Sequence, residues 1–382
     1  MLHPTSYIFH LGREKKLCLA EILEFFPQAE PFEVEESGFV IVKEQFDLNI
    51  IHRLGGTIKI SEIIKELPAS MPINFSELIE TEILKLKREP GKFQYGISTY
   101  PENPSLIRKL LKTAKTTLKE NGVSSRYLNQ DNNNLSSIMS ANCEEINLVF
   151  GKKTYMTKTV ATQDIESYGF RDYERPARDD RSGMLPPKLA QIMINLANPE
   201  KDTVIYDPFC GSGTVLQEAL MMGFDTAGTD ISEKAVRDSK TNLEWVTKNF
   251  QIGKTCLKLE LKDATKLTTS DYLFDGRKIA IVAESYLGEP QKDIPTPEKA
   301  HELLQKLEPI YLNFLKTPIP TGTRIVLALP FFNLKPNPVY LEDLIYKVRE
   351  LGYIIPAHES DILYYARRKQ VVGRMILRLT KQ

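Results

Sequence analysis

The chain has 382 residues, of which 42% are hydrophobic and 26% charged, as is ordinary for folded soluble domains. This length is enough for about two or three domains. The 50 basic and 50 acidic residues give a formal net charge of zero, which excludes a globally basic nucleic-acid coat but not a local basic surface.

Membrane insertion, secretion and metal binding are not expected. No apolar run reaches the roughly 18 residues of a membrane-spanning helix, and the amino terminus lacks the pattern of a secretory signal. The four cysteines are too scattered for a disulfide framework or a CxxC zinc site. We therefore expect a cytoplasmic protein that binds no metal.

Residues 1–68 are predicted to form a small α+β, ferredoxin-like domain. Over residues 1–60 there are 6 basic and 9 acidic residues, which does not indicate a nucleic-acid surface. The expected elements are strands at 7–9, 32–35, 38–42 and 57–60, and helices at 17–23 and near 48–54.

A second domain is predicted over residues 69–162, with a strand at 93–98 and a basic amphipathic helix at 106–121. Residues 101–160 carry 9 basic and 5 acidic residues, a local excess of four positive charges. Lys112 and Lys115 share one helix face, and Arg126 follows the helix. We expect these three side chains to contact RNA phosphate, although a solvated helix face would look the same.

Residues 163–187 lack periodicity and are interpreted as a linker. Arg171 and Arg175 alternate there with aromatic residues. Arginine beside aromatic rings is suited to phosphate contact and base stacking, so both are predicted to bind RNA. The alternative is a linker packed by its own aromatic side chains.

From residue 188 to the end, strand and helix patterns alternate. This order predicts a Rossmann-like α/β domain over 188–382, with an open, mostly parallel sheet covered by helices on both faces. The expected helices are 188–196, 215–222 and 233–249, and the expected strands are 203–206, 224–229, 278–283, 323–329 and 374–379.

A glycine-rich turn, DPFCGSGT at 207–214, lies between the first strand and the following helix of this domain. Glycines there let the backbone approach a ligand, and the helix amino terminus favours an anionic group. No lysine follows as in a P-loop, and Leu216 replaces the third glycine of a dinucleotide motif. S-adenosylmethionine is the remaining candidate.

Three carboxylates in order suit that cofactor. Asp207 would bind its ammonium group while the turn amides bind its carboxylate, and Asp230, at the end of the second strand, would bind the ribose hydroxyls. Asp263, followed by Ala264, would accept from the adenine amino group. The alternative is packing glycines and helix-capping aspartates. The turn residues predicted to contact the cofactor are Phe209, Gly211, Gly213 and Thr214.

The turn resembles the cofactor motif of methyltransferases that act on exocyclic amines of nucleobases. The preceding segment, 181–197, is similar to that of tRNA guanosine N2-methyltransferases, which include the archaeal and eukaryotic enzymes acting on guanosine 10. This resemblance implies S-adenosylmethionine as cofactor and tRNA as partner. It also places Gly183 and Met184 beside the methionine end of the cofactor.

The amino-terminal half is similar to the same family. GVSSRY at 122–127 and LSS at 135–137 resemble a THUMP domain, an RNA-binding module for the tRNA acceptor end. Residues 364–379 resemble the closing strands of the family's catalytic domain. Eukaryotic relatives require a small activating protein subunit, so the resemblance implies such a subunit as a candidate partner of this chain.

The match fails at the acceptor site, where the family has (D/N)PP(Y/F) after the fourth strand. This chain has IAIVAESYLG at 279–288, without either proline and with the spacing shortened by one. We expect Glu284 to replace the missing acidic residue and Tyr286 to be the platform on which a flipped base stacks. Alternatively, Glu284 caps the next segment and Tyr286 fills a core, leaving little catalysis.

Together these features predict S-adenosylmethionine-dependent methylation of an exocyclic amine in tRNA, at N2 of guanosine. A DNA methyltransferase acting on adenine N6 or cytosine N4 is one alternative, because it shares the cofactor motif. A catalytically weak RNA-binding protein is the other, because the acceptor motif is altered.

Overall fold

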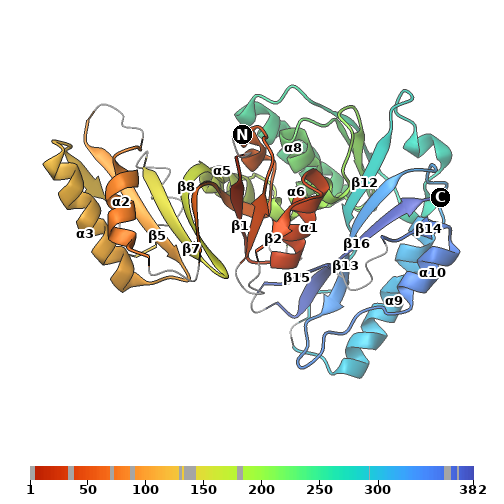
Figure 1. The fold of residues 1–382 in the computed structure, drawn as a ribbon. Helices are drawn as coiled ribbons and strands as arrows, with labels where there is room; N and C mark the ends of the chain where they lie inside the picture. The colour runs from red at the N-terminus through yellow and green to blue at the C-terminus, as the bar shows by residue number, and fades with distance from the viewer. Residues whose placement is uncertain are drawn as a thin grey trace. The chain divides into compact units, whose positions relative to one another are not determined.

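The chain divides into two units, Met1–Ser167 and Tyr168–Gln382, each built around its own eight-stranded sheet (Figure 1). The structure is a computed structural model. No helix in the described part of the chain is both long and apolar enough to cross a membrane. The described residues are 5–32, 38–68, 73–86, 91–128, 131–132, 143–178, 184–291, 293–356, 363–367 and 370–382.

The first unit has one continuous sheet with the strand order β2-β3-β1-β4-β8-β7-β5-β6. Its strands are β1 (Tyr7–Leu11), β2 (Glu30–Pro31), β3 (Phe39–Val42), β4 (Thr57–Pro68), β5 (Phe93–Tyr100), β6 (Ser125–Tyr127), β7 (Glu144–Phe150) and β8 (Lys153–Thr162). Because β4 pairs with β8 along its length, the predicted segments 1–68 and 69–162 contribute to the same sheet. The division at residue 68 stays a prediction.

Helices of the first unit are α1 (Lys15–Phe25), α2 (Phe75–Ile83) and α3 (Pro104–Glu120), with a 3-10 helix at Leu48–His52. Helix α3 begins where Asn103 accepts a hydrogen bond from the Leu106 amide at 3.1 Å and Pro104 occupies the first turn. One face of α3 is buried, and Figure 1 shows α2 and α3 side by side against the sheet. The α-helix expected near 48–54 is thus only a short 3-10 turn.

The second unit has the strand order β11-β10-β9-β12-β13-β16-β14, with β15 paired to β16. Strands β9 to β13 run parallel, and β16 runs antiparallel to its neighbours. This confirms the predicted Rossmann-like α/β class. The strands are β9 (Val204–Asp207), β10 (Thr226–Asp230), β11 (Cys256–Leu261), β12 (Ile279–Glu284), β13 (Arg324–Phe332), β14 (Tyr353–Ile354), β15 (Leu363–Tyr365) and β16 (Val372–Lys381).

Helices cover both faces of this sheet. Figure 1 shows α8 on one side and α9 with α10 on the other. The helices are α6 (Pro187–Leu196), α7 (Thr214–Met221), α8 (Glu233–Phe250), α9 (Pro297–Leu315) and α10 (Leu344–Glu350), with 3-10 helices at Ala264–Lys266 and Thr269–Tyr272. The consecutive residues Ile205 and Tyr206 of β9 are both buried, and because successive strand residues point to opposite faces, both faces of the sheet contribute to the core.

The sheet reverses its order at β9, which is flanked by β10 on one side and β12 on the other. Ligands of open α/β sheets bind at such a switch point, outside the carboxyl ends of the strands. Asp207, Asp230 and Glu284 are the last residues of β9, β10 and β12. The topology therefore gathers three carboxylates at one edge of the sheet.

Part of the expected linker is helical. Helix α5 (Ile165–Tyr173) occupies a stretch whose sequence predicts no periodic structure. It forms because Tyr168 and Arg171, three residues apart, turn to the same side and are buried. A helical pattern is usually recognised from the spacing of apolar residues. Because one of the two buried positions of α5 is an arginine, that spacing is not visible in the sequence.

Candidate cofactor and acceptor site

The turn between β9 and α7 has a backbone that only glycine adopts without strain. Gly211 has φ +51° and Gly213 has φ +84°. A Cβ atom on Gly213 would lie 2.7 Å from the Ser239 Oγ of α8, whereas one on Gly211 would meet nothing nearer than 4.0 Å. Gly213 is therefore needed for packing against α8, and Gly211 for the course of the turn.

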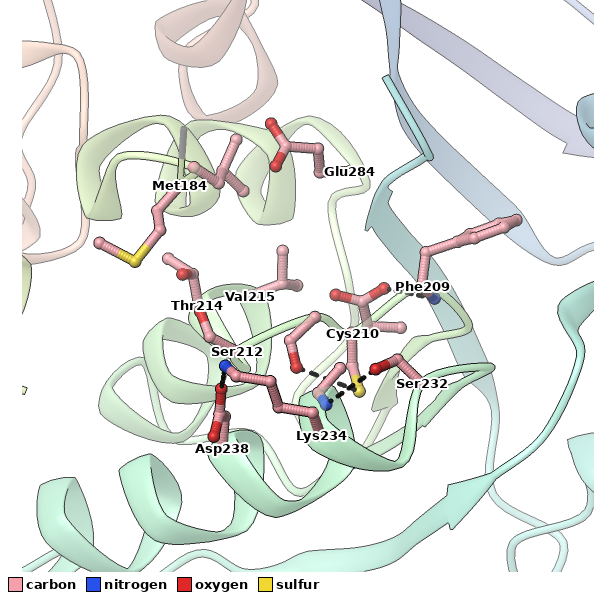
Figure 2. A pocket seen from close by; sticks show the side chains of 14 residues that line it. Met184, Phe209, Cys210, Ser212, Thr214, Val215, Ser232, Lys234, Asp238 and Glu284 are labelled. Atoms are coloured by element: carbon pink, nitrogen blue, oxygen red, sulfur yellow. Dashed lines mark hydrogen bonds and ion pairs between the residues drawn. The ribbon is translucent and has the colours of Figure 1, made fainter. Parts of the chain in front are cut away.

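A pocket lies over this turn (Figure 2). It is lined by five of the residues predicted for the cofactor, namely Met184, Asp207, Phe209, Gly211 and Thr214. The first turns of α8 and the end of β12 complete it. Its further lining residues are Leu185, Cys210, Ser212, Val215, Ser232, Lys234, Ala235, Asp238 and Glu284.

Asp230 is held against the turn by backbone amides. Its Oδ2 accepts from the Gly211 amide and its Oδ1 from the Ser232 amide, both at 2.9 Å. Each carboxylate oxygen has a second lone pair available for a ligand hydroxyl. The carboxylate is thus fixed in place at the end of β10 without its acceptor capacity being used up.

Asp207 lies inside the pocket and is only 2% exposed. Burial raises the pKa of its carboxyl well above the usual value, and the charges of Asp230 and Glu284 raise it further. The Phe209 amide, which donates to Asp207 Oδ1 at 3.0 Å, opposes that shift. A buried carboxylate beside two others is an environment that favours a cationic ligand.

Four described residues predicted to bind the cofactor do not line the pocket, and one of them is Asp230, which bonds the lining residue Gly211. Gly213 packs against α8, and Ala264 is buried. Asp263 caps the 3-10 helix that follows it, accepting from the Thr265 amide at 2.9 Å and hydroxyl at 2.7 Å. The hydroxyl bond from Thr265 is the main cause that lowers the pKa of Asp263. A fifth predicted residue, Gly183, lies outside the described residues.

Glu284, predicted to be the acceptor group, ends β12 and lines the same pocket (Figure 2). Its Oε1 accepts from the Nε of Arg374, which is 1% exposed. Burial raises the pKa of Glu284, while the charge and hydrogen bond of Arg374 act in the opposite direction. Glu284 is therefore an ion-paired pocket residue and not the cap of the next segment.

Tyr286 presents its side chain to solvent. It is 48% exposed, so the alternative that it fills a core is wrong. Its backbone carbonyl accepts from the Tyr311 hydroxyl at 2.7 Å. The amide and hydroxyl of Ser285 donate to the Ala328 carbonyl at 3.0 and 2.9 Å. These bonds fix the backbone after β12, although both prolines of the family's motif are missing.

Arg171 and Arg175 are not placed to contact RNA. They are only 3% and 2% exposed. Arg171 donates to both carboxylate oxygens of Glu218, at 2.8 and 3.1 Å, and its guanidinium lies 4.6 Å from the Tyr168 ring centre. The predicted phosphate contacts are therefore wrong for both arginines, because a buried acidic residue on α7 draws Arg171 inward and Arg175 packs beside it on α7.

The other three predicted RNA contacts lie on the first unit. Lys112 is exposed on α3. Arg126 is also exposed and donates to Gln94 Oε1 at 2.8 and 3.0 Å. Lys115 is partly buried, and its Nζ donates to the Ser125 carbonyl. Lys112 has the most accessible charge of the three.

Several residues that shape the site were not predicted from the sequence. Lys234 and Ser232 line the pocket from α8, and the position of α8 directly after Asp230 was a signal that could have found them. Asn242 bonds Ser212 and Ala177 and ties the turn to the segment before α6. Arg374 had no signal, because its partner Glu284 lies 90 residues away in the chain.

Comparison with known proteins identifies the second unit. Residues 175–275 match the UPF0020 family, described as an RMKL-like methyltransferase domain. A tRNA (guanine(10)-N2)-dimethyltransferase of Methanothermobacter thermautotrophicus is 30% identical over 181 residues, which is 47% of this chain and 47% of that protein. The enzyme of the same name from Pyrococcus abyssi is 35% identical over 100 residues, or 26% of this chain and 27% of that one. The chain thus matches about half or less of the length of these curated relatives.

Solved structures share the fold over nearly the whole chain. TrmN from Thermus thermophilus superposes with a TM-score of 0.53 and 17% identity, covering 99% of this chain and 100% of its own. SMU.472, a protein solved in complex with SAH, superposes with a TM-score of 0.52 and 13% identity, covering 100% of this chain and 99% of its own. The sequence match to a methyltransferase domain family thus covers residues 175–275, and the solved structures show a shared fold.

Proposed function

We propose that the protein uses this methyltransferase domain to transfer the methyl group of S-adenosylmethionine to an exocyclic amine of tRNA, at N2 of guanosine. One observation carries the proposal: Asp207, Asp230 and Glu284 end three neighbouring strands around a glycine turn. The sequence relatives that bear the name tRNA (guanine(10)-N2)-dimethyltransferase support the choice of amine and of tRNA.

The lining of the pocket fits the chemical groups of the cofactor. When bound, the cofactor supplies a methyl group on a positively charged sulfur. Asp207 would hold the ammonium group, and Asp230 would accept from the ribose hydroxyls. Ile231, directly after Asp230, has an apolar side chain that is 72% exposed and suits a planar adenine ring. Asp230, Asp263 and Ala264 do not line the pocket, but Asp230 accepts from the amide of the lining residue Gly211 and is therefore better supported than the other two. The proposed contact of Gly183 rests on the family resemblance alone.

Glu284 and Tyr286 would receive the acceptor base. The lone pair of a guanine N2 amine is delocalised into the ring, so a hydrogen-bond acceptor near the amine helps to localise it. The Glu284 carboxylate would accept from the amine and take up the proton released after methyl transfer; its raised pKa suits that role. The exposed ring of Tyr286 would stack on the flipped base.

RNA would bind through the first unit, with Lys112, Lys115 and Arg126 as phosphate contacts and residues 69–162 acting as a THUMP-like domain. Because such side chains neutralise phosphate charges, the affinity for RNA should fall as the salt concentration rises. We place the protein in the cytoplasm, where tRNA would be its substrate. A small activating protein subunit is a further partner to be tested when the chain alone shows low turnover.

The test is methyl transfer from labelled S-adenosylmethionine to unmodified bulk tRNA, followed by nucleoside analysis. Wild type and Glu284→Gln are assayed together, and S-adenosylhomocysteine binding is measured for both. Label in N2-methylguanosine supports the proposal. Preferential labelling of duplex DNA would favour a DNA methyltransferase. Cofactor binding without labelling of any RNA, with or without cell extract as a source of a subunit, would favour an RNA-binding protein.

A further inference from the structure

Arg175 is a buried cation that forms no ion pair with a carboxylate of the described residues, although the charges of Asp172 and Glu218 act on it. Its side chain is 2% exposed, and within the described residues it makes no ion pair. Its Nη1 donates to Thr214 Oγ1 at 2.6 Å and its Nη2 lies 3.0 Å from Met184 Sδ, while its Nε has no hydrogen-bond partner among the described residues. The other buried arginines of this unit, Arg171 and Arg374, each pair with a glutamate.

Burial of a charge that lacks an ion-pair partner is unfavourable. Burial is the main cause that lowers the pKa of Arg175, while the charges of Asp172 and Glu218 act in the opposite direction. The neighbouring backbone nevertheless holds the residue in place. The amide and carbonyl of Ala177 both bond the Asn242 side chain at 2.9 Å. The surrounding structure thus keeps a positive charge beside the cofactor turn.

Both side chains that Arg175 contacts line the pocket. Thr214 is the first residue of α7, and Figure 2 shows Thr214 and Met184 near each other on one side of the pocket. The helix amino terminus adds its partial positive charge at the same place. Lys234, a cation of the pocket lining, is ion-paired with Asp238. The part of the pocket at Thr214 and Met184 is therefore basic, whereas Asp207 and Glu284 contribute acidic groups to the same lining.

The Thr214 hydroxyl connects the guanidinium to the pocket. Because Oγ1 accepts a hydrogen bond from Arg175, the hydroxyl hydrogen is left to donate elsewhere. A hydroxyl that accepts from a cation is also a stronger donor, since hydrogen bonds in a chain polarise one another. An anionic group in the pocket would be the natural acceptor.

We propose that Arg175 is a positioning residue for the carboxylate of the cofactor's amino-acid end, acting through the Thr214 hydroxyl and by its charge. The basic part of the pocket would bind the carboxylate and Asp207 the ammonium group, so that the two together recognise an α-amino acid. This inference rests on the proposed function, because it assumes an S-adenosylmethionine site.

The test compares two ligands that differ only in the carboxylate. Binding of S-adenosylhomocysteine and of its decarboxylated form, S-adenosyl-3-thiopropylamine, is measured by calorimetry for wild type, Arg175→Met, Arg175→Lys and Thr214→Val. We expect Arg175→Met to weaken S-adenosylhomocysteine binding by about tenfold or more and to leave the decarboxylated ligand within about twofold. Thr214→Val should act in the same direction, and Arg175→Lys should retain part of the preference.

Arg171→Lys is the matched control, since it alters a buried arginine of the same segment whose partner is Glu218. It should change the affinities for both ligands equally or not at all. Equal weakening of both ligands by Arg175→Met, or no effect of Thr214→Val, would overturn the inference. If Arg175→Met fails to fold, the inference is tested by whether Thr214→Val and Arg175→Lys reduce the preference for the ligand that has a carboxylate. Wild type that binds neither ligand would instead contradict the proposed function itself.

Discussion

Arg374 of β16 donates through its Nε to Oε1 of Glu284, the last residue of β12, across the intervening strand β13. In the register of these strands, Glu284 lies beside Ala328 and Arg374 beside Pro330. The ion pair therefore fixes a carboxylate at the edge of the pocket from a strand that itself contributes no lining residue among those described. It takes over part of the rigidity that a proline-containing motif would provide.

Replacing Glu284 by Gln should remove methyl transfer but keep the cofactor site. An amide lacks the charge needed to draw the amine proton, so we expect the turnover number to fall by about 100-fold or more. Affinity for S-adenosylhomocysteine should change by less than about threefold. Rapid-quench assays and calorimetry measure the two effects, and unchanged turnover would remove Glu284 from the mechanism.

Replacing Arg374 by Met should shift the pH dependence of turnover. Glu284 must be ionised to accept from the amine, and burial already raises its pKa, so the rate falls as pH drops through that pKa. Without Arg374 the pKa rises further, and the acid limb of the profile moves to higher pH. The pH profile of single-turnover rates tests this, with Arg374→Lys as the variant that retains the charge and most of the wild-type profile.

Cofactor binding should release a proton at Asp207. Burial raises the pKa of this carboxyl, whereas binding of an ammonium group requires the ionised form. Affinity should therefore increase as pH rises through the raised pKa and level off above it. Calorimetry in buffers of different ionisation enthalpy measures the proton release, and Asp207→Asn should abolish it. Affinity that is independent of pH would contradict this role of Asp207.

Gly213→Ala should destabilise the second unit by about 2–3 kcal/mol, because the new Cβ atom adds a contact with Ser239 to the strain of a positive φ. Gly223→Ala is the matched control. It has φ +85° and nothing within 4 Å of the position that a Cβ atom would take, so only the backbone strain of about 1 kcal/mol applies. Denaturant unfolding compares the two, and Ser239→Ala should recover part of the loss in Gly213→Ala.

Lys112→Glu should weaken tRNA binding and reduce the salt dependence of the affinity by about one to two counterions, because an exposed cation of α3 is reversed. Lys16→Glu, an exposed lysine of α1, is the control for the change in net charge. Filter binding at several salt concentrations tests the difference. If the affinity for tRNA depends on salt concentration equally in both variants, Lys112 does not contact RNA and this face of α3 is only solvated.

Local sequence patterns predicted the second unit well. The glycine turn, the alternation of strands and helices and the acidic residues after the strands are properties of neighbouring positions. The carboxyl ends of parallel strands meet at one edge, so Asp207, Asp230 and Glu284 could be brought together by reasoning alone. Asp263 is not brought to the pocket lining, because it follows β11 at the outside of the sheet, where β10 separates that strand from the switch point, and its contact with the cofactor stays a prediction.

The class of fold, the turn and most of the turn residues that line the pocket were predictable without coordinates, because they follow from short-range periodicity and from the special backbone of glycine. The side chains that the buried arginines contact were not predictable. Arg171 pairs with Glu218 and Arg374 with Glu284, while Arg175 forms no ion pair within the part of the chain that the structure describes. Each outcome depends on which buried group lies opposite after folding, at separations of 39 to 90 residues that no local pattern records.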